Sequence, residues 1–291
     1  ILILDEVMDV VEELGDFTKD DLDTILSKNL AYIEDDYLLW NEDNLDWDGR
    51  YSDIKNMALN RNLICINGRL LYWNFPVDIF NYFNEVYILT YMFDCQIQRY
   101  YYDYHGIEFE KYQIDNGKIV KYTEGRENDR IKEIAKLINI YDGKLNTVGD
   151  DKYSLSLSWF DKDDGTLQGI LKNNIYNWFN NVNRKVGAKY RLWTTFKDYK
   201  NKISGKGYTN RFISLNIRAT NEYRHTYILA YCTNRFIKPT MVQFFSNRNV
   251  SLNQEQYALS EMLQWIWRSR IREGQEIHIY IPSKRMRELL I

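Results

Sequence analysis

Short apolar runs alternate with amphipathic segments through the second half of the chain, and this alternation constrains the fold most strongly. Helix-like spacing is present at 166–183 and 254–272. The runs with strand character are YSLSLSWF (153–160), YRLWTTF (190–196), FISLN (212–216), YILAYC (227–232) and EIHIYIP (276–282). Strands that alternate with helices favour a parallel sheet covered by helices on both faces. The pattern therefore predicts an α/β fold.

The chain opens with four apolar residues, Ile-Leu-Ile-Leu, followed directly by Asp5 and Glu6. A continuous apolar run is typical of a central parallel strand that is buried on both faces. Because the chain starts inside this strand and without Met, we expect a fragment whose first domain is truncated at its N-terminus. Further strands are predicted at LICIN (63–67), LLYWN (70–74) and VYILTYMF (86–93).

A chain of 291 residues is long enough for two domains. We predict that residues 1–123 form the C-terminal part of a first parallel-sheet domain with an irregular acidic insertion. Residues 124–152 are polar, contain one amphipathic helix, and are interpreted as a connector. Residues 153–291 then form a second, nearly complete α/β domain.

Composition excludes several classes of protein. The net charge of -3 disfavours a basic body that wraps nucleic acid, although a local basic patch is compatible with it. Cys65, Cys95 and Cys232 lie far apart, so they support neither a disulfide framework nor a zinc site and fit a reducing, cytoplasmic compartment. No apolar run is long enough to span a bilayer, and we expect no membrane partner.

Asp5 and Glu6 are the sharpest chemical signal. They stand at the carboxyl end of the opening strand, where parallel sheets bind ligands. In a nucleotide hydrolase the Asp holds Mg²⁺, and the Glu orients or deprotonates the attacking water. The alternative is an ordinary turn, because acidic residues also favour the start of a helix.

The second signal is the segment ALSEMLQWIWRSRIREG (258–274). Gln264, Arg268 and Arg272 fall at i, i+4 and i+8, on one face of a helix. Such a stripe can contact phosphate oxygens and supply an arginine finger to a transferring phosphoryl group. A solvated basic face is the alternative.

Two further segments have the composition of a nucleic-acid contact. SLNIRATNEYRHTY (214–227) concentrates polar residues after a predicted strand, among them Arg218, Thr220 and Asn221, although a capped helix start explains them equally well. KDYKNKISGKGYTNR (197–211), with Lys206, is the best local phosphate-binding candidate, and an exposed loop is its alternative. Aromatic and basic residues also mix at 99–106 and 173–193, as in single-strand binders, although such aromatics more often form core.

Together these motifs resemble those of superfamily-two (DEAD/DEAH-like) helicases of the phage replication type. DEVMD (5–9) resembles their acidic box, LTYMF (89–93) their coupling motif, 214–227 their fifth motif and QWIWRSRIR (264–272) their sixth. Trp267 stands where the sixth motif usually has Gly, and Arg270 and Arg272 straddle the position of its second Arg. Either arginine is therefore a candidate for the finger.

The resemblance implies two RecA-like domains, the first truncated, and an ATP-dependent helicase or translocase acting in phage DNA replication or recombination in the host cytoplasm. Asp5 would hold Mg²⁺ and Glu6 would position the water. Gln264, Arg268 and Arg272 would act from the opposite domain, and Arg270 would contact ATP. Thr90 would couple hydrolysis to movement along single-stranded or duplex nucleic acid, with DNA favoured and replication proteins as further partners.

The sequence contains no GxxxxGK[ST] phosphate loop, so we expect that these 291 residues alone neither bind ATP tightly nor hydrolyse it. The main rival is a non-catalytic module that binds single-stranded nucleic acid or contacts the replication machinery. A nuclease that uses Asp5 and Glu6 as metal ligands is a third hypothesis, but no further carboxylate cluster supports it.

Overall fold

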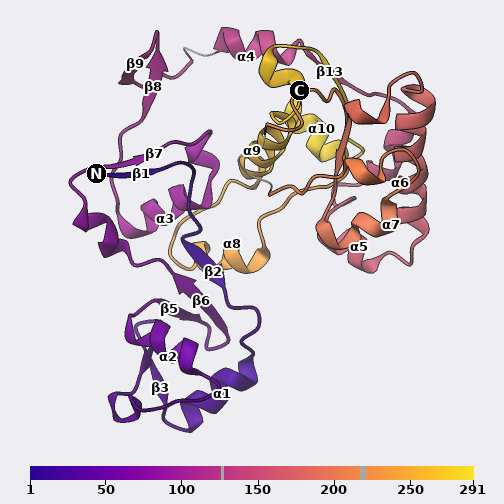
Figure 1. Ribbon diagram of the computed structural model, residues 1–291. Coiled ribbons are helices and arrows are strands. Elements are labelled where there is room, and N and C mark those ends of the chain that lie inside the picture. Colours follow the sequence, from indigo (N-terminus) through magenta and orange to yellow (C-terminus); the bar gives the residue numbers. More distant parts are fainter. Residues whose placement is uncertain (126–127, 217–220) are drawn as a thin grey trace. The chain divides into compact units, whose positions relative to one another are not determined.

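The computed structural model describes residues 1–125, 128–216 and 221–291 (Figure 1). These residues form two compact units. Unit 1 consists of Ile1–Phe109 and Lys238–Asn253, and unit 2 of Glu110–Ile237 and Gln254–Ile291. This division does not follow the borders predicted at residues 123 and 152, and the chain crosses between the units three times.

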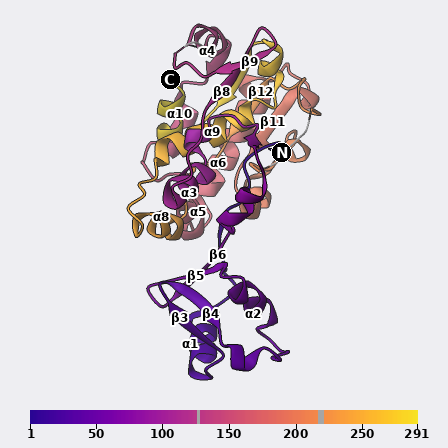
Figure 2. The same ribbon diagram turned by 90° about the vertical axis from the view of Figure 1, so that its left-hand side faces the viewer.

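Unit 1 is built on a five-stranded antiparallel sheet, and Figure 2 shows four of its strands, β3 to β6, together with helices α1 and α2. The strand order is β2-β6-β5-β4-β3, and a separate parallel pair joins β1 to β7. The elements are β1 (Leu2–Leu4), β2 (Val11–Glu13), α1 (Lys19–Ser27), β3 (Ala31–Glu34), β4 (Tyr37–Trp40), α2 (Ser52–Leu59), β5 (Leu63–Ile66), β6 (Leu70–Asn74), β7 (Val86–Ile88), α3 (Ile97–His105) and α8 (Pro239–Ser246).

The prediction of a parallel RecA-like sheet in the first domain is wrong, and tight turns explain why. Asp35 and Asp36 join β3 to β4 with φ of 49° and 67°. Asn67 and Gly68, with φ of 54° and 58°, turn the chain from β5 into β6. Short turns of this kind make antiparallel hairpins, whereas parallel neighbours need a long crossover connection.

The opening strand is also not the buried central strand that its composition predicts. Among the strands of the described residues, β1 pairs with β7 alone, and Ile1 and Ile3 are 74% and 62% exposed. The spacing of residues 7–31 predicts a helix with Thr18 as its N-terminal cap, but these residues hold β2, α1 and the start of β3. The cap is confirmed, because the Thr18 hydroxyl accepts a hydrogen bond from the Asp21 amide at the start of α1.

A segment from the second half of the chain completes the core of unit 1. Phe244 and Phe245 of α8 are fully buried against Tyr72, whose ring lies 5.0 Å from that of Phe244. The Tyr72 hydroxyl donates to the carbonyl of Thr240, and the Thr240 hydroxyl donates to Glu13. Lys238–Asn253 is therefore an excursion of the chain into the other unit.

Unit 2 contains a four-stranded sheet of order β10-β13-β12-β11 in which every pair is parallel. Helices cover both faces, so this predicted architecture is confirmed. One core includes Phe160, Leu171 and Ile203, from α5, α6 and α7, and the opposite core includes Met262 and Met286, from α9 and α10. The elements are β8 (Tyr112–Asp115), β9 (Lys118–Lys121), α4 (Asn128–Ala135), β10 (Ile138–Ile140), α5 (Leu157–Lys162), α6 (Thr166–Asn177), β11 (Arg191–Thr194), α7 (Lys200–Ile203), β12 (Ile228–Tyr231), α9 (Gln254–Ile266), β13 (Ile277–Tyr280) and α10 (Lys284–Leu290).

Three predicted elements of unit 2 differ in the structure. Residues 153–160 are a turn and the start of α5, because the Ser156 hydroxyl caps that helix by accepting from the Trp159 amide. Residues 212–216 form only an isolated parallel bridge between Trp193 and Phe212. The segment predicted as a connector contains β10, an edge strand of the sheet.

Candidate functional site

Aromatic and cationic side chains gather at the amino edge of the parallel sheet of unit 2. Tyr190 directly precedes β11 and Tyr227 directly precedes β12, and the Tyr227 amide donates to the Tyr190 carbonyl at 2.9 Å. The Arg270 amide donates to Thr226, and its Nε donates to the Glu276 carbonyl just before β13. Backbone bonds that extend the sheet by one residue thus set the positions of these side chains.

The rings and cations form a row, in which the two rings are tilted at 41° to each other. The Tyr190 and Tyr227 ring centroids lie 5.3 Å apart. The Lys189 ammonium lies 4.9 Å from the Tyr190 centroid, and the Arg270 guanidinium lies 3.9 Å from that of Tyr227. The imidazole of His225 contacts the Lys189 carbonyl at 2.9 Å. We call Lys189, Tyr190, His225, Tyr227, Arg270 and Arg272 the amino-edge cluster.

A basic segment adjoins this cluster. Residues 184–211, which run before and after edge strand β11, contain nine Lys or Arg and one Asp. Arg191 is buried and donates to Asn180 and to the carbonyls of Val186 and Gly207, so its role is structural. None of the nine forms an ion pair with another described residue. Most of this positive charge is therefore open to solvent.

The predicted arginine stripe does not lie on one helix. α9 ends at Ile266, and a new 3₁₀ turn, Arg270–Glu273, begins after Ser269, whose hydroxyl accepts from the Ile271 amide. Gln264 is therefore on α9, Arg268 is in the turn between, and Arg270 and Arg272 are on the 3₁₀ turn. The i, i+4, i+8 geometry is wrong because the Ser269 cap interrupts the helix.

Arg270 and Arg272 nonetheless lie together at the amino edge. Arg272 is exposed, and its guanidinium donates to Asn221 at 2.6 Å. Asn221 is thus placed beside the cluster, whereas Arg218 and Thr220 fall outside the described residues. Lys206 is exposed in the loop after α7, and its carbonyl accepts a hydrogen bond from Asn180.

Asp5, Glu6 and Thr90 belong to unit 1 and lie at the carboxyl ends of the parallel pair β1 and β7. The Leu89 amide donates to the Leu4 carbonyl at 2.8 Å, which brings the start of the acidic pair beside Thr90. Both carboxylates are exposed. No group of three or more His, Cys, Asp or Glu that could hold a metal ion is found within the described ranges, so no third side chain of these types joins Asp5 and Glu6 there.

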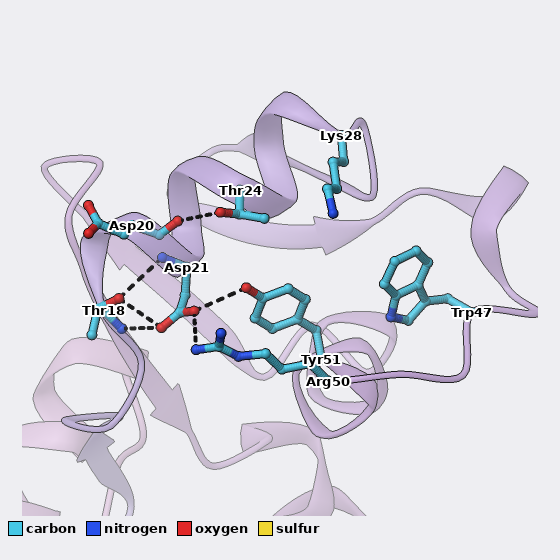
Figure 3. Close-up of a pocket in the computed structure, with 8 residues that line it drawn as sticks. All are labelled: Thr18, Asp20, Asp21, Thr24, Lys28, Trp47, Arg50 and Tyr51. Carbon is cyan, nitrogen blue, oxygen red and sulfur yellow. Dashed lines mark hydrogen bonds and ion pairs between the residues drawn. The ribbon is translucent and has the colours of Figure 1, made fainter.

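Unit 1 has a surface cavity of about 540 Å³ beside the start of α1. Figure 3 shows the buried Asp21 carboxylate held between Thr18, the Tyr51 hydroxyl and Arg50. The Arg50–Asp21 distance is 2.6 Å, and the Thr18 hydroxyl lies 2.7 Å from the carboxylate. The lining residues are Thr18, Asp20, Asp21, Thr24, Lys28, Trp47, Arg50 and Tyr51.

The Asp21 carboxylate in this cavity is already fully engaged. The hydroxyl of Thr18, followed by its amide and by Tyr51 and Arg50, holds the pKa of Asp21 below its ordinary value. Burial and the hydrogen bond to Asp21 raise the pKa of Tyr51. A carboxylate with this many donors stabilises the fold and has little capacity left for a ligand. We therefore assign this carboxylate to the helix cap and place the candidate functional site in unit 2.

The sequence pointed to the two stretches that contribute most of the amino-edge cluster, but it did not predict that they lie together. Lys189 and Tyr190 lie in the aromatic and basic stretch 173–193, and His225 and Tyr227 lie in the polar stretch 214–227. What was missed is that Tyr190 and Tyr227 are neighbours. The apolar runs that follow them, when aligned as adjacent parallel strands, are the signal that would have found this pair.

A parallel four-stranded sheet with helices on both faces defines unit 2 as an α/β domain of Rossmann-like type. The family comparisons agree: a model described as the YonV C-terminal Rossmann-like domain matches residues 132–291, and one described as the YonV middle domain matches residues 11–73. The whole chain is 46% identical to the SPbeta prophage-derived uncharacterized protein YonV of Bacillus subtilis (strain 168), 72% of which is covered. The chain belongs to the YonV family.

This membership corrects the predicted one. The resemblance to superfamily-two helicases is wrong as a family assignment, because the chain matches YonV over its full length and the sheet of unit 1 is antiparallel. The expected phage-type origin is supported by the prophage-derived relative. No solved structure matches the chain. In the parts that the structure describes, no helix is long and apolar enough to cross a membrane.

Proposed function

We propose that this protein binds single-stranded nucleic acid, without catalysis, through the amino-edge cluster and the adjoining basic segment of unit 2. The observation that carries the proposal is the row of Lys189, Tyr190, Tyr227 and Arg270, in which two neighbouring rings each have a cation over them. Exposed cations hold a phosphate backbone, while aromatic rings and arginine planes stack on bases.

The charge of unit 2 supports the proposal. Unit 2 contains 29 Lys or Arg and 19 Asp or Glu, whereas unit 1 contains nine and 22. The basic excess is therefore confined to the unit that carries the cluster. A polyanion is attracted to such a unit over a distance set by ionic strength, and binding should weaken steeply as salt is added.

The geometry of the cluster favours unpaired bases. Tyr190 and Tyr227 are half-buried, so each presents part of a ring at the surface while backbone bonds hold its position. A base that is already stacked inside a duplex has no free face for such a ring. Stacking on a protein aromatic contributes about 1–3 kcal/mol per base and is tolerant of sequence.

The test measures the anisotropy of a fluorescent oligothymidylate titrated with the full chain at several salt concentrations. Replacing Lys189 and Arg272 by Ala should weaken binding roughly tenfold. It should also reduce the salt slope, which is the slope of log K against log salt concentration, by about 0.7 for each phosphate that the variant no longer neutralises. Tyr190→Leu should weaken binding while leaving the salt slope unchanged, because it removes a stacking face and no charge.

Lys28→Ala is the matched control, because Lys28 is an exposed lysine of the acidic unit 1. It should bind like the unaltered chain. If the Lys189 and Arg272 variant also binds like the unaltered chain, the amino-edge cluster is not the interface.

An ATP-dependent motor, with ATP and Mg²⁺ as cofactors and a RecA-like form for the second domain, stays a prediction. The pairing of β1 with β7 favours it, because Asp5 and Glu6 follow one strand and Thr90 follows the other at the same end of the pair. The full chain lacks a phosphate loop, and we expect no magnesium-dependent ATP turnover from it in a phosphate-release assay.

A further inference from the structure

We propose that the exposed face of the β1–β7 pair in unit 1 is a docking surface for a further region of the family's polypeptide. That region is the part of the Bacillus subtilis relative that lies outside its match to this chain. The inference concerns unit 1 and does not depend on nucleic-acid binding by unit 2.

β1 and β7 form a separate two-stranded parallel sheet (Figure 1). Leu2–Leu4 runs in register with Val86–Ile88, and the Leu89 amide extends the ladder by donating to the Leu4 carbonyl. Among the described residues, neither strand pairs with a further strand. Parallel sheets occur almost only where both faces are covered, and a two-stranded sheet is marginally stable by itself. The pair therefore has the features of one part of a larger parallel layer.

The two faces of the pair differ in burial. Ile88 packs against the core of unit 1. On the opposite face, Ile3 and Tyr87 stand directly opposite each other and are 62% and 42% exposed. Leu89 follows two residues after Tyr87 and is 57% exposed. Because side chains alternate along a strand, these three side chains share one face, and a layer that covers it would gain their apolar area.

The relative indicates which polypeptide covers this face. The match of 299 residues accounts for 72% of that relative, so the rest is on the order of 100 residues, the size of a small domain. The matching family models are described as a middle and a C-terminal domain, and the C-terminal one extends to the last residue of this chain. We therefore place the rest of the relative ahead of its middle domain and call it the N-terminal region.

Proximity along the polypeptide favours this occupant over a separate partner. The match to the middle domain begins at residue 11, and β1 lies directly ahead of it. The N-terminal region of the relative is therefore connected to the segment that corresponds to β1. A tethered region has an effective concentration in the millimolar range when its linker is short, so a small apolar face is enough to hold it.

The experiment measures hydrogen exchange at Val86–Leu89, which lies inside the chain. The full chain is extended ahead of Ile1 either by the N-terminal region of the relative or by a Gly/Ser segment of equal length. The N-terminal region should slow exchange at Val86–Leu89 by roughly tenfold or more, whereas the flexible Gly/Ser segment should leave it unchanged.

The double variant Ile3→Ser with Tyr87→Ser should abolish the difference between the two extensions, because it removes the apolar face. Tyr82→Ser is the matched control, since Tyr82 is an 84% exposed aromatic residue of the same unit outside the pair. It should keep the full difference, and far-UV circular dichroism checks that each variant is folded.

The intact relative provides a second measurement that does not depend on the folding of an extended chain. Its segment equivalent to Val86–Leu89 should exchange slowly, and trimming the relative to the matched part should speed exchange there roughly tenfold. Fast exchange of this segment in the intact relative overturns the proposal, whatever the extended chain shows. Sedimentation of the unextended chain tests the other occupant: a dimer that the double serine variant abolishes would assign this face to a second copy and also overturns the proposal.

Discussion

The two units of this chain differ in the sign of their charge and in the way their sheets are connected. Unit 1 has 22 Asp or Glu against nine Lys or Arg, and its main sheet is antiparallel. Unit 2 has 19 against 29, and its main sheet is parallel. The overall charge of -3 is therefore the sum of the charges of one acidic and one basic unit. An acidic unit repels a phosphate backbone, so only unit 2 has the charge that a nucleic-acid interface needs.

The units also differ in how they complete their cores. Both faces of the parallel sheet in unit 2 are covered by helices of that unit. The core of unit 1 includes Phe244 and Phe245, which come from the excursion Lys238–Asn253 between β12 and α9. In unit 2, Arg285 donates to the Arg235 and Gln254 carbonyls and so holds the two ends of the excursion together. Replacing a core residue of the excursion should therefore destabilise unit 1 more than unit 2.

The largest effect is expected for Phe244→Ala. This ring is fully buried and contacts Tyr72 and Tyr104, so its removal leaves a cavity and should lower the free energy of unfolding by about 3–5 kcal/mol. Urea denaturation followed by circular dichroism measures the change. Tyr82→Ala, which removes a ring that is 84% exposed, is the control and should be nearly neutral. Equal stabilities for the two variants would show that the excursion does not support unit 1.

An intermediate effect that depends on pH is expected at His105. Burial, followed by the nearby charge of Arg248, lowers the pKa of His105 from 6.5 to about 4. The folded state keeps this imidazole neutral, so unit 1 loses stability as pH falls from about 6.5 towards 4, by up to about 1.4 kcal/mol per pH unit. His105→Gln should flatten this dependence in urea denaturation at pH 7 and pH 5. Parallel pH curves for the two proteins would contradict the assignment.

The parallel sheet of unit 2 could be predicted from the sequence, whereas in unit 1 the strands at 63–67, 70–74 and 86–93 were predicted but the antiparallel direction of the main sheet was not. YRLWTTF, YILAYC and EIHIYIP alternate with long amphipathic segments, and only a crossover fold accommodates that order. LICIN and LLYWN are equally apolar, but a buried run does not reveal the direction of its neighbour. The direction depended on Asn67 and Gly68, a short turn signal between the two runs.

The candidate site was predicted only in part for a similar reason. Arg270 and Arg272 were predicted from the sequence to act on ATP, which stays a prediction, and the structure places both at the amino edge. The contact between Tyr190 and Tyr227 depends on which strands are neighbours and in what register, and no local pattern encodes that. At Ser269 the local pattern was misleading. The periodicity of 254–272 predicted a single long helix, but the Ser269 hydroxyl caps a new 3₁₀ turn after the helix has ended.

The smallest effect is expected for the helix cap in the acidic unit. Thr18→Ala removes the hydroxyl that accepts from the Asp21 amide and donates to its carboxylate, and should lower the free energy of unfolding by about 1 kcal/mol. Because the pKa of Asp21 is lowered in the fold, this stabilisation is present above the ordinary value of 3.8 and is lost as pH falls below it. Thermal unfolding at pH 7 and pH 3 should show a difference between variant and parent that shrinks in acid. Thr24→Ala is the matched control, since Thr24 lines the same cavity but its hydroxyl donates to the Asp20 carbonyl one turn back in the helix, so it does not cap the helix start. That variant should be neutral or slightly stabilising, and an equal loss at both threonines would show that the cap has no special role.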